Sequence, residues 1–232
     1  MSSKPSTVKA LSLTAAVIAS STVAFTGMTS LAQEQDFRGQ KIVQVLQEPR
    51  HRTVHKDGDI YLLDVQVNPG DTSYLHTHDA AILYTFISNG DGPLYGRVSG
   101  NTDYAEENFT HQVSNPGPGL FRIMALTNYG NGVEMDNDQP QGVGSPADVE
   151  NKWFRSYRIE LAPGEESSIQ SHQNPSVIIQ TRQGKVYVSR EDGITVELSA
   201  MGDWAWRDAN SAFKLTNPGN ASVEVVINEA RR

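Results

Sequence analysis

Two stretches of the sequence repeat one pattern, and this repeat restricts the fold more than any other feature. The segment Leu63–Gly70 lines up with Tyr157–Gly164, and both segments end in Pro-Gly. Further on, Val113–Gly117 lines up with Leu215–Gly219, and each holds an aliphatic residue, a hydroxyl residue and Asn-Pro-Gly. Such self-similarity indicates one structural unit that occurs twice. A unit of roughly 90 residues suffices for a small β-barrel but is marginal alone, so we expect the two units to pack on each other or on another subunit.

The residue pattern in both units is typical of β-structure. Asn89–Pro93 reads Asn-Gly-Asp-Gly-Pro and is a strong hairpin signal. No long helix is predicted, so we expect an all-β protein built from sandwiches or barrels. Six runs rich in β-branched and aromatic residues, bounded by Gly, Pro and Asn, predict strands over 61–67, 81–88, 121–127, 157–161, 177–181 and 222–227.

Two histidines in the first unit are spaced to share one face of a strand. Side chains alternate along a strand, so the rings of His76 and His78 can converge on one point. His111 comes from another β-like run, Phe109 to Val113. Three imidazoles from two strands can hold a divalent transition metal and leave coordination positions open for a substrate. The alternative is that these rings are ordinary barrel-interior residues held by hydrogen bonds.

The spacing around these histidines resembles the first sequence motif of the cupin superfamily, G-x5-H-x-H-x4-E-x6-G. Gly70, His76, His78 and Gly90 fall in register with it, but Leu83 stands where the motif has glutamate. The resemblance therefore implies a metal site with three histidines and one missing carboxylate ligand. With Leu83 in that place, we expect a drier and more apolar pocket on its side.

The second cupin motif, G-x5-P-x-G-x2-H-x3-N, is matched less completely. Gly100, His111 and Asn115 fit at full spacing, while other residues replace the proline and the second glycine. An alternative alignment uses Asn128 and would put Met124 at the ligand position. We prefer His111 because both Gly100 and Asn115 then fit.

The resemblance implies two tandem cupin-like (jelly-roll) barrels, with the metal motifs intact only in part and only in the N-terminal copy. In the second copy, Gln170 stands at the position of His76 and Phe213 at that of His111. His172, the counterpart of His78, is retained. One imidazole and one amide hold a transition metal poorly, so we expect this copy to be a structural or lid-forming domain without a metal.

The expected organisation is a signal peptide over 1–32, an N-terminal barrel over 40–130, a linker over 131–150 and a degenerate C-terminal barrel over 151–232. The linker region holds Gly, Pro and five acidic residues but no Lys or Arg, which is typical of a solvated segment.

The first 32 residues have the features of a secretory signal peptide. Lys4 and Lys9 precede an apolar run over 10–25, and Ser30 and Ala32 offer small residues at a cleavage site. Ser and Thr interrupt the run, which makes it a poor membrane span, although an uncleaved anchor is the alternative. We therefore expect a periplasmic or secreted protein without a permanent membrane anchor. The chain has no cysteine, so an oxidising compartment imposes no disulfide.

The charge of the chain bears on its partners. The formal net charge is −8 and no basic stretch offsets it, so phosphate would be repelled and nucleic acid is not an expected partner. We expect a small-molecule substrate or ligand instead. A homodimer is a further possibility that the cupin resemblance implies.

Tyr74 and Arg122 are the candidate catalytic residues, and each has a competing interpretation. Tyr74 shares the strand parity of His76 and should point into the barrel, where it could bond a substrate or simply fill space. Arg122, near a strand end, could pair with an anionic substrate or make an exposed or interdomain salt bridge. His51 and His55 precede the first motif and are interpreted as surface or rim residues.

Two enzyme groups and one binding role remain open. Three-histidine cupins resemble iron-dependent dioxygenases on the one hand and metal-dependent isomerases or lyases on the other. Three neutral imidazoles leave a divalent metal at +2, which attracts an anionic, chelating substrate. Iron is the favoured metal, with manganese, nickel or zinc as alternatives. The competing class is a non-catalytic periplasmic protein that binds a metal or small molecule, because this fold alone does not set function.

Overall fold

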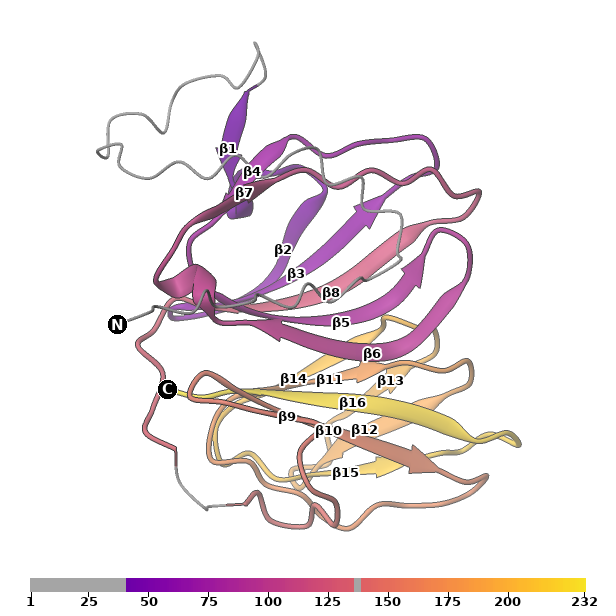
Figure 1. The fold of residues 1–232 in the computed structure, drawn as a ribbon. Coiled ribbons are helices and arrows are strands. Elements are labelled where there is room, and N and C mark those ends of the chain that lie inside the picture. Colours follow the sequence, from indigo (N-terminus) through magenta and orange to yellow (C-terminus); the bar gives the residue numbers. More distant parts are fainter. Residues whose placement is uncertain (1–40, 136–138) are drawn as a thin grey trace, which may run out of the picture.

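The computed structural model describes residues 41–135 and 139–232, which form two β-barrels in chain order (Figure 1). The predicted all-β class is confirmed, since the described helical segments are two short 3-10 turns, η1 (Val45–Gln47) and η2 (Asp103–Ala105). Among the described residues, no helix combines the length and apolar character needed to cross a membrane. The predicted signal peptide over 1–32 lies outside the described residues.

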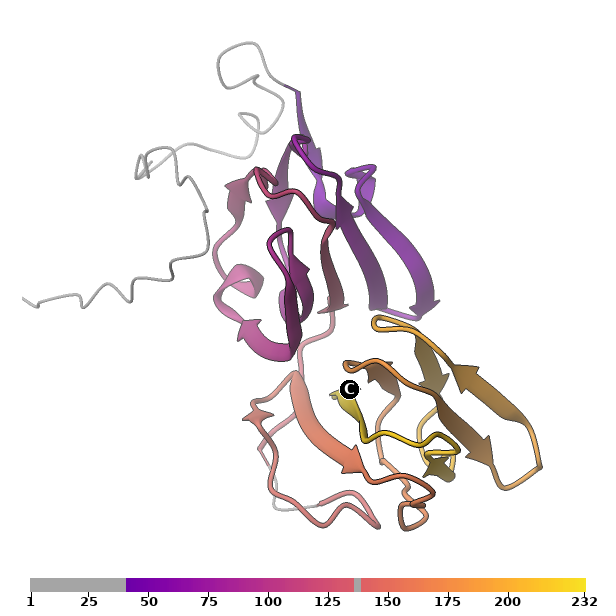
Figure 2. The same cartoon turned by 90° about the vertical axis from the view of Figure 1, so that its right-hand side faces the viewer.

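The first barrel is built from two sheets that curl against each other (Figure 2). One sheet has five strands in the order β2-β3-β8-β5-β6, and the other has three in the order β1-β4-β7. The strands are β1 (Ile42–Gln44), β2 (His51–Asp57), β3 (Ile60–Val67), β4 (Leu75–His78), β5 (Ala81–Asn89), β6 (Pro93–Asn101), β7 (Phe109–His111) and β8 (Phe121–Asn128).

The second barrel repeats this arrangement, with one sheet in the order β14-β11-β16-β10-β9 and another in the order β13-β12-β15. The strand β9 consists of the last two residues of the predicted linker, which pair with β10. The strands are β9 (Val149–Glu150), β10 (Phe154–Leu161), β11 (Ser176–Gln180), β12 (Val186–Arg190), β13 (Thr195–Leu198), β14 (Trp204–Arg207), β15 (Phe213–Thr216) and β16 (Val223–Ala230).

The repeated Asn-Pro-Gly segments make the same turn in both barrels. The amide of Asn115 donates to the carbonyls of Val67 and Gly119, and that of Asn217 donates to the carbonyls of Leu161 and Ala221. Both asparagines are fully buried. Each side chain links the last residue of one strand, β3 or β10, to the turn just before its neighbour, β8 or β16. The sequence repeat is therefore explained by a repeated structural requirement rather than by a repeated metal site.

The two five-stranded sheets pack face to face, so the barrels share one apolar layer (Figure 1). From the first barrel this layer takes Leu62, Leu83 and Met124, all fully buried, and Phe154 and Ile179 come from the second. Each barrel has a separate interior cluster of its own. Because each large sheet is apolar on both faces, its strands read as nearly continuous hydrophobic runs.

Polar contacts fix how the two barrels sit on each other. The side-chain amide of Asn228 on β16 donates to the hydroxyl of Thr85 on β5 over 2.7 Å, with both residues fully buried. Arg158 donates to the carbonyl of Gly96 over 2.7 Å, and Asn128 donates to the carbonyl of Arg231 over 2.9 Å. Buried polar groups that are paired in this way favour one orientation over the alternatives that apolar packing alone would allow.

Candidate metal centre

Strand pairing brings the three predicted histidines together. His76 and His111 are directly opposite each other in the antiparallel pair β4–β7, and His78 lies two residues along β4 on the same face. One ring nitrogen of each lies within 4.8 Å of those of the other two. His76 and His78 are buried, and His111 is partly buried.

The hydrogen bonds of this cluster leave nitrogen lone pairs free for a metal. Nδ1 of His76 donates to the backbone carbonyl of Tyr74 over 2.9 Å, which fixes the tautomer and leaves Nε2 as an acceptor. That Nε2 is buried and has no hydrogen-bond partner, whereas Nε2 of His78 and Nε2 of His111 lie 3.0 Å apart. An orphaned imidazole nitrogen beside two others is the donor set that a divalent transition metal requires.

All three imidazoles are held neutral. Burial, followed by the neighbouring histidines, lowers the pKa of His76 to about 3 and that of His78 to about 2. Burial and the nearby His51 lower the pKa of His111 to about 4. Metal ligation needs the deprotonated ring, so this environment favours ligation over a much wider pH range than exposed histidine would allow.

These pKa shifts predict that the metal-free protein loses stability as the pH falls below 6.5, the ordinary histidine value. In the window from 6.5 down toward 4 the unfolded chain binds up to three more protons than the folded one. The free energy of unfolding should therefore fall by up to about 1.4 kcal/mol per pH unit for each histidine. Urea unfolding at roughly pH 7, 6 and 5 measures this slope. The His78→Gln variant should give a shallower slope, and equal slopes would contradict the prediction.

A cavity of about 380 Å³ opens beside the cluster and is lined mostly by apolar and aromatic side chains. His78 and His111 reach its wall from one side, while Phe86, Phe121 and Ile123 line it from the large sheet. Asp91 is the one acidic residue among the described lining residues, which include no Lys or Arg. The cavity can thus surround an uncharged, apolar body that presents a polar group to the histidines.

Two tyrosines that no sequence motif marks also lie on the cavity wall. Burial raises the pKa of Tyr84 and that of Tyr104, so both phenols stay protonated at neutral pH. The ring of Tyr104 lies 5.2 Å from that of His78 and stacks on Phe109 at 5.1 Å between centroids. Neither residue belongs to a motif, because β5 and η2 come close to the histidines only in the folded structure.

A fourth histidine, His51, lies beside the cluster, so the prediction that it is a surface or rim residue is wrong. It is 5% exposed, lines the cavity and has its ring centroid 4.3 Å from that of His76. Its Nδ1 lies 2.7 Å from the carboxylate of Glu48, which is itself 2% exposed. Glu48 and His51 lie three residues apart, on either side of the turn between η1 and β2. This close spacing is the sequence signal that could have suggested that the two side chains interact.

The structure does not bring Tyr74 into the cavity. Its side chain is 48% exposed and faces Arg50, whose guanidinium carbon lies 5.9 Å from the ring centroid. Tyr74 precedes the first residue of β4, so strand alternation does not extend to it. What Tyr74 contributes to the centre is its backbone, because its carbonyl binds His76 and its N–H donates to Glu48.

Arg122 lies between the barrels rather than in the cavity. Its Nε donates to the carboxylate of Asp64 over 2.9 Å, and its terminal nitrogens donate to the carbonyls of Met201 and Gly202. Gly202 has a φ of +84°, and a Cβ there would lie 2.6 Å from the guanidinium. Arg122 thus makes a salt bridge within the first barrel, to Asp64, and crosses to the second barrel through hydrogen bonds to backbone carbonyls rather than through an interdomain salt bridge.

Leu83 does not border the metal centre, contrary to the expectation of a drier pocket on its side. It is fully buried in the layer between the barrels, while Ile82 and Tyr84 on either side of it face the barrel interior. His78 ends β4 in one sheet and Ala81 begins β5 in the other. The inward and outward alternation of side chains therefore does not continue from His78 to Leu83. The position of the missing glutamate is therefore a packing position in this chain.

The second barrel holds other residues at the corresponding positions. Gln170 and Phe213 form an isolated bridge that matches the pairing of His76 with His111. His172 is 2% exposed, lies 3.4 Å from the carboxylate of Glu229 through Nδ1, and stacks on Phe213. Within residues 41–135 and 139–232, the first-barrel histidines make up the one cluster suited to a metal.

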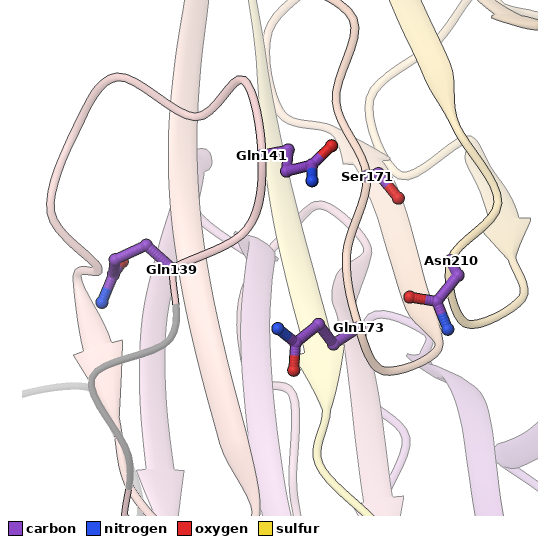
Figure 3. A pocket seen from close by; sticks show the side chains of 5 residues that line it. All are labelled: Gln139, Gln141, Ser171, Gln173 and Asn210. Carbon is purple, nitrogen blue, oxygen red and sulfur yellow. The ribbon is translucent and has the colours of Figure 1, made fainter.

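A second hollow, of about 390 Å³, lies at the second barrel (Figure 3). Figure 3 shows the amides of Gln141, Gln173 and Asn210 around Ser171, on loops next to β16. These side chains carry no group that ligates a transition metal strongly, so this hollow is not a second metal centre.

Comparison with known proteins relates the chain to solved structures only. No family model matches it, and no curated protein does. AerE from Microcystis aeruginosa aligns with a TM-score of 0.57 at 14% identity, over 80% of this chain and 99% of that one. A protein from Leptotrichia buccalis described as a cupin 2 conserved barrel domain protein aligns with a TM-score of 0.50 at 13% identity, over 78% and 88%. At such identities the similarity establishes the fold.

Proposed function

Starting from the cupin fold, which this chain has in two tandem copies, we propose that the protein is a divalent-metal enzyme acting on a small organic substrate. The observation that carries the proposal is the convergence of three neutral imidazoles, two buried and one partly buried, beside a largely apolar cavity. A metal held by His76, His78 and His111 would supply either redox or Lewis-acid chemistry to a substrate in the cavity. We propose iron as this metal and an O₂-dependent cleavage, a dioxygenase reaction, as the activity.

The cavity supports a substrate with an apolar or aromatic body and one polar end. Phe86, Phe109 and Phe121 provide aromatic surface for the body, and no Lys or Arg among the described lining residues offers a charge to a distant anionic group. An oxygen group of the substrate would then lie at the histidines. Enols, phenols and hydroxy ketones fit this description.

The phenols of Tyr84 and Tyr104 have a role in this proposal as a hydrogen-bonded pair of neutral groups. Tyr84 is hydrogen-bonded to Tyr104, so Tyr104 is the phenol that can donate to a carbonyl or oxyanion in the cavity without ionising. Donors that are already oriented stabilise developing negative charge at little reorganisation cost.

The test begins with the protein recovered from the periplasm of its host, to which we propose that it is exported with removal of residues 1–32. Its mass reports that cleavage, and elemental analysis is expected to find about one transition metal per chain. Oxygen uptake is then measured with a panel of phenols, enols and diketones, with His78→Ala as the control. Substrate-dependent uptake that the control lacks would support a dioxygenase.

The other outcomes separate the alternatives. Conversion of a substrate without oxygen uptake would indicate an isomerase or lyase. Metal without any turnover would indicate a binding protein. A wild-type protein that holds no metal and takes none up on titration would overturn the proposal.

A further inference from the structure

His51 lines the cavity but is not one of the three clustered histidines, and it is paired with the buried carboxylate of Glu48 behind it. Glu48 is an acceptor for several donors: the ring of His51, the N–H of Tyr74 and the N–H of Arg50. Burial acts to raise the pKa of Glu48, but the hydrogen bond from His51 and those from the backbone outweigh it and lower the pKa to about 2. The carboxylate is thus ionised and fully engaged, so it acts as a fixed acceptor.

A fixed acceptor at Nδ1 determines what His51 presents to the cavity. Because the carboxylate of Glu48 can only accept, Nδ1 of His51 must carry a proton, so in the neutral ring Nε2 is the nitrogen with the lone pair. The ring lines the cavity together with His78 and His111, and its centroid lies 6.4 Å from that of His78. His51 is not part of the group whose nitrogens all lie within 4.8 Å of one another. It therefore stands next to the metal centre rather than in it.

We propose that His51 accepts a hydrogen bond from a hydroxyl of the ligand held at the three histidines, and that Glu48 positions it for this. The inference rests on the proposed metal site and adds a selection rule to it. The cavity should prefer ligands whose metal-binding oxygen group still carries a proton, such as the monoanion of a catechol or an enol. A ligand without such a proton gains nothing from His51. Glu48 is a positioning residue, since it acts only through the ring.

The test compares a protic with an aprotic probe on the full chain loaded with cobalt(II). The protic probe is 4-nitrocatechol, whose visible absorption reports both binding and ionisation, and the aprotic probe is azide. His51→Phe is expected to weaken 4-nitrocatechol about tenfold, as for the loss of one hydrogen bond, and to leave azide within about twofold. Cobalt stoichiometry should stay at one per chain.

Three further variants make the result specific. Glu48→Gln can donate its amide to Nδ1 and so reverse the tautomer, and it should weaken 4-nitrocatechol selectively although Glu48 does not line the cavity. His51→Gln places an amide oxygen near the position of Nε2 and should restore much of the affinity. His55→Phe removes a histidine of the same strand that packs on Trp206, and it should change neither probe.

Each remaining outcome has one meaning. A wild-type chain that takes up no cobalt overturns the metal site itself, and with it the inference. Cobalt binding with equal effects of His51→Phe on both probes, or with no effect on either, overturns the inference and leaves the metal site standing. Loss of cobalt in His51→Phe would show that His51 is a ligand, which also contradicts the proposed role.

Discussion

Metal binding is expected to be lost when His76 or His111 is replaced by alanine. Each residue supplies one of three converging nitrogens, and among the described residues no other His, Cys, Asp or Glu belongs to this group. Removing a residue that only hydrogen-bonds to a metal ligand costs about 10–100-fold in metal affinity. Loss of the ligand itself should therefore cost at least about a hundredfold. Titration with zinc or cobalt(II), followed by elemental analysis after dialysis, measures the effect.

The matched control is His172→Ala, the corresponding residue of the second barrel. His172 interacts with Glu229 and Phe213 inside that barrel, so its removal should leave the metal content of the chain unchanged. Metal retained in both first-barrel variants would show that the three histidines are not the ligands.

Placing glutamate at position 83, where the cupin motif has its carboxylate, is expected to unfold the protein rather than to complete the metal site. Leu83 has no exposed surface and lies in the apolar layer between the barrels. A carboxylate there has no partner, and an unpaired buried charge costs more than about 4 kcal/mol. Urea unfolding and size-exclusion chromatography of Leu83→Glu measure the loss.

Leu83→Met is the matched control for this substitution, because it keeps the apolar character and nearly the volume. It should cost less than about 1.5 kcal/mol. A stable Leu83→Glu protein that binds metal more tightly than the wild type would mean that position 83 faces the centre after all.

Much of the fold could be predicted because it depends on local patterns. Each of the six predicted runs matches a strand to within a few residues, for example 61–67 against β3 and 222–227 against β16. β-branched runs between turn residues are a direct consequence of strand geometry. The edge strand β6 was not predicted, since it contains Pro93, Gly96 and Gly100 and reads as a loop.

The site could be predicted only as far as strand alternation extends. His76 and His78 lie within one strand, so their common direction follows from spacing alone. Tyr74 lies before that strand, so strand parity gave the wrong direction for it, and Leu83 lies after a change of sheet, so its place in the motif did not put it at the centre. His51 reaches the cavity from β2 in the opposite sheet, which no local pattern could indicate.

The face-to-face packing of the barrels has a consequence for how such a chain can evolve. A lone barrel would need a second molecule to cover its large sheet, whereas here a covalently attached copy does so at any protein concentration. Selection on that copy then acts on the surface it offers and on contacts such as Asn228 with Thr85. The interior of the second barrel does not need ligands, so Gln170 and Phe213 can stand at the positions of His76 and His111 without loss to the first barrel. One half of the chain thus serves the other as a covalently attached subunit.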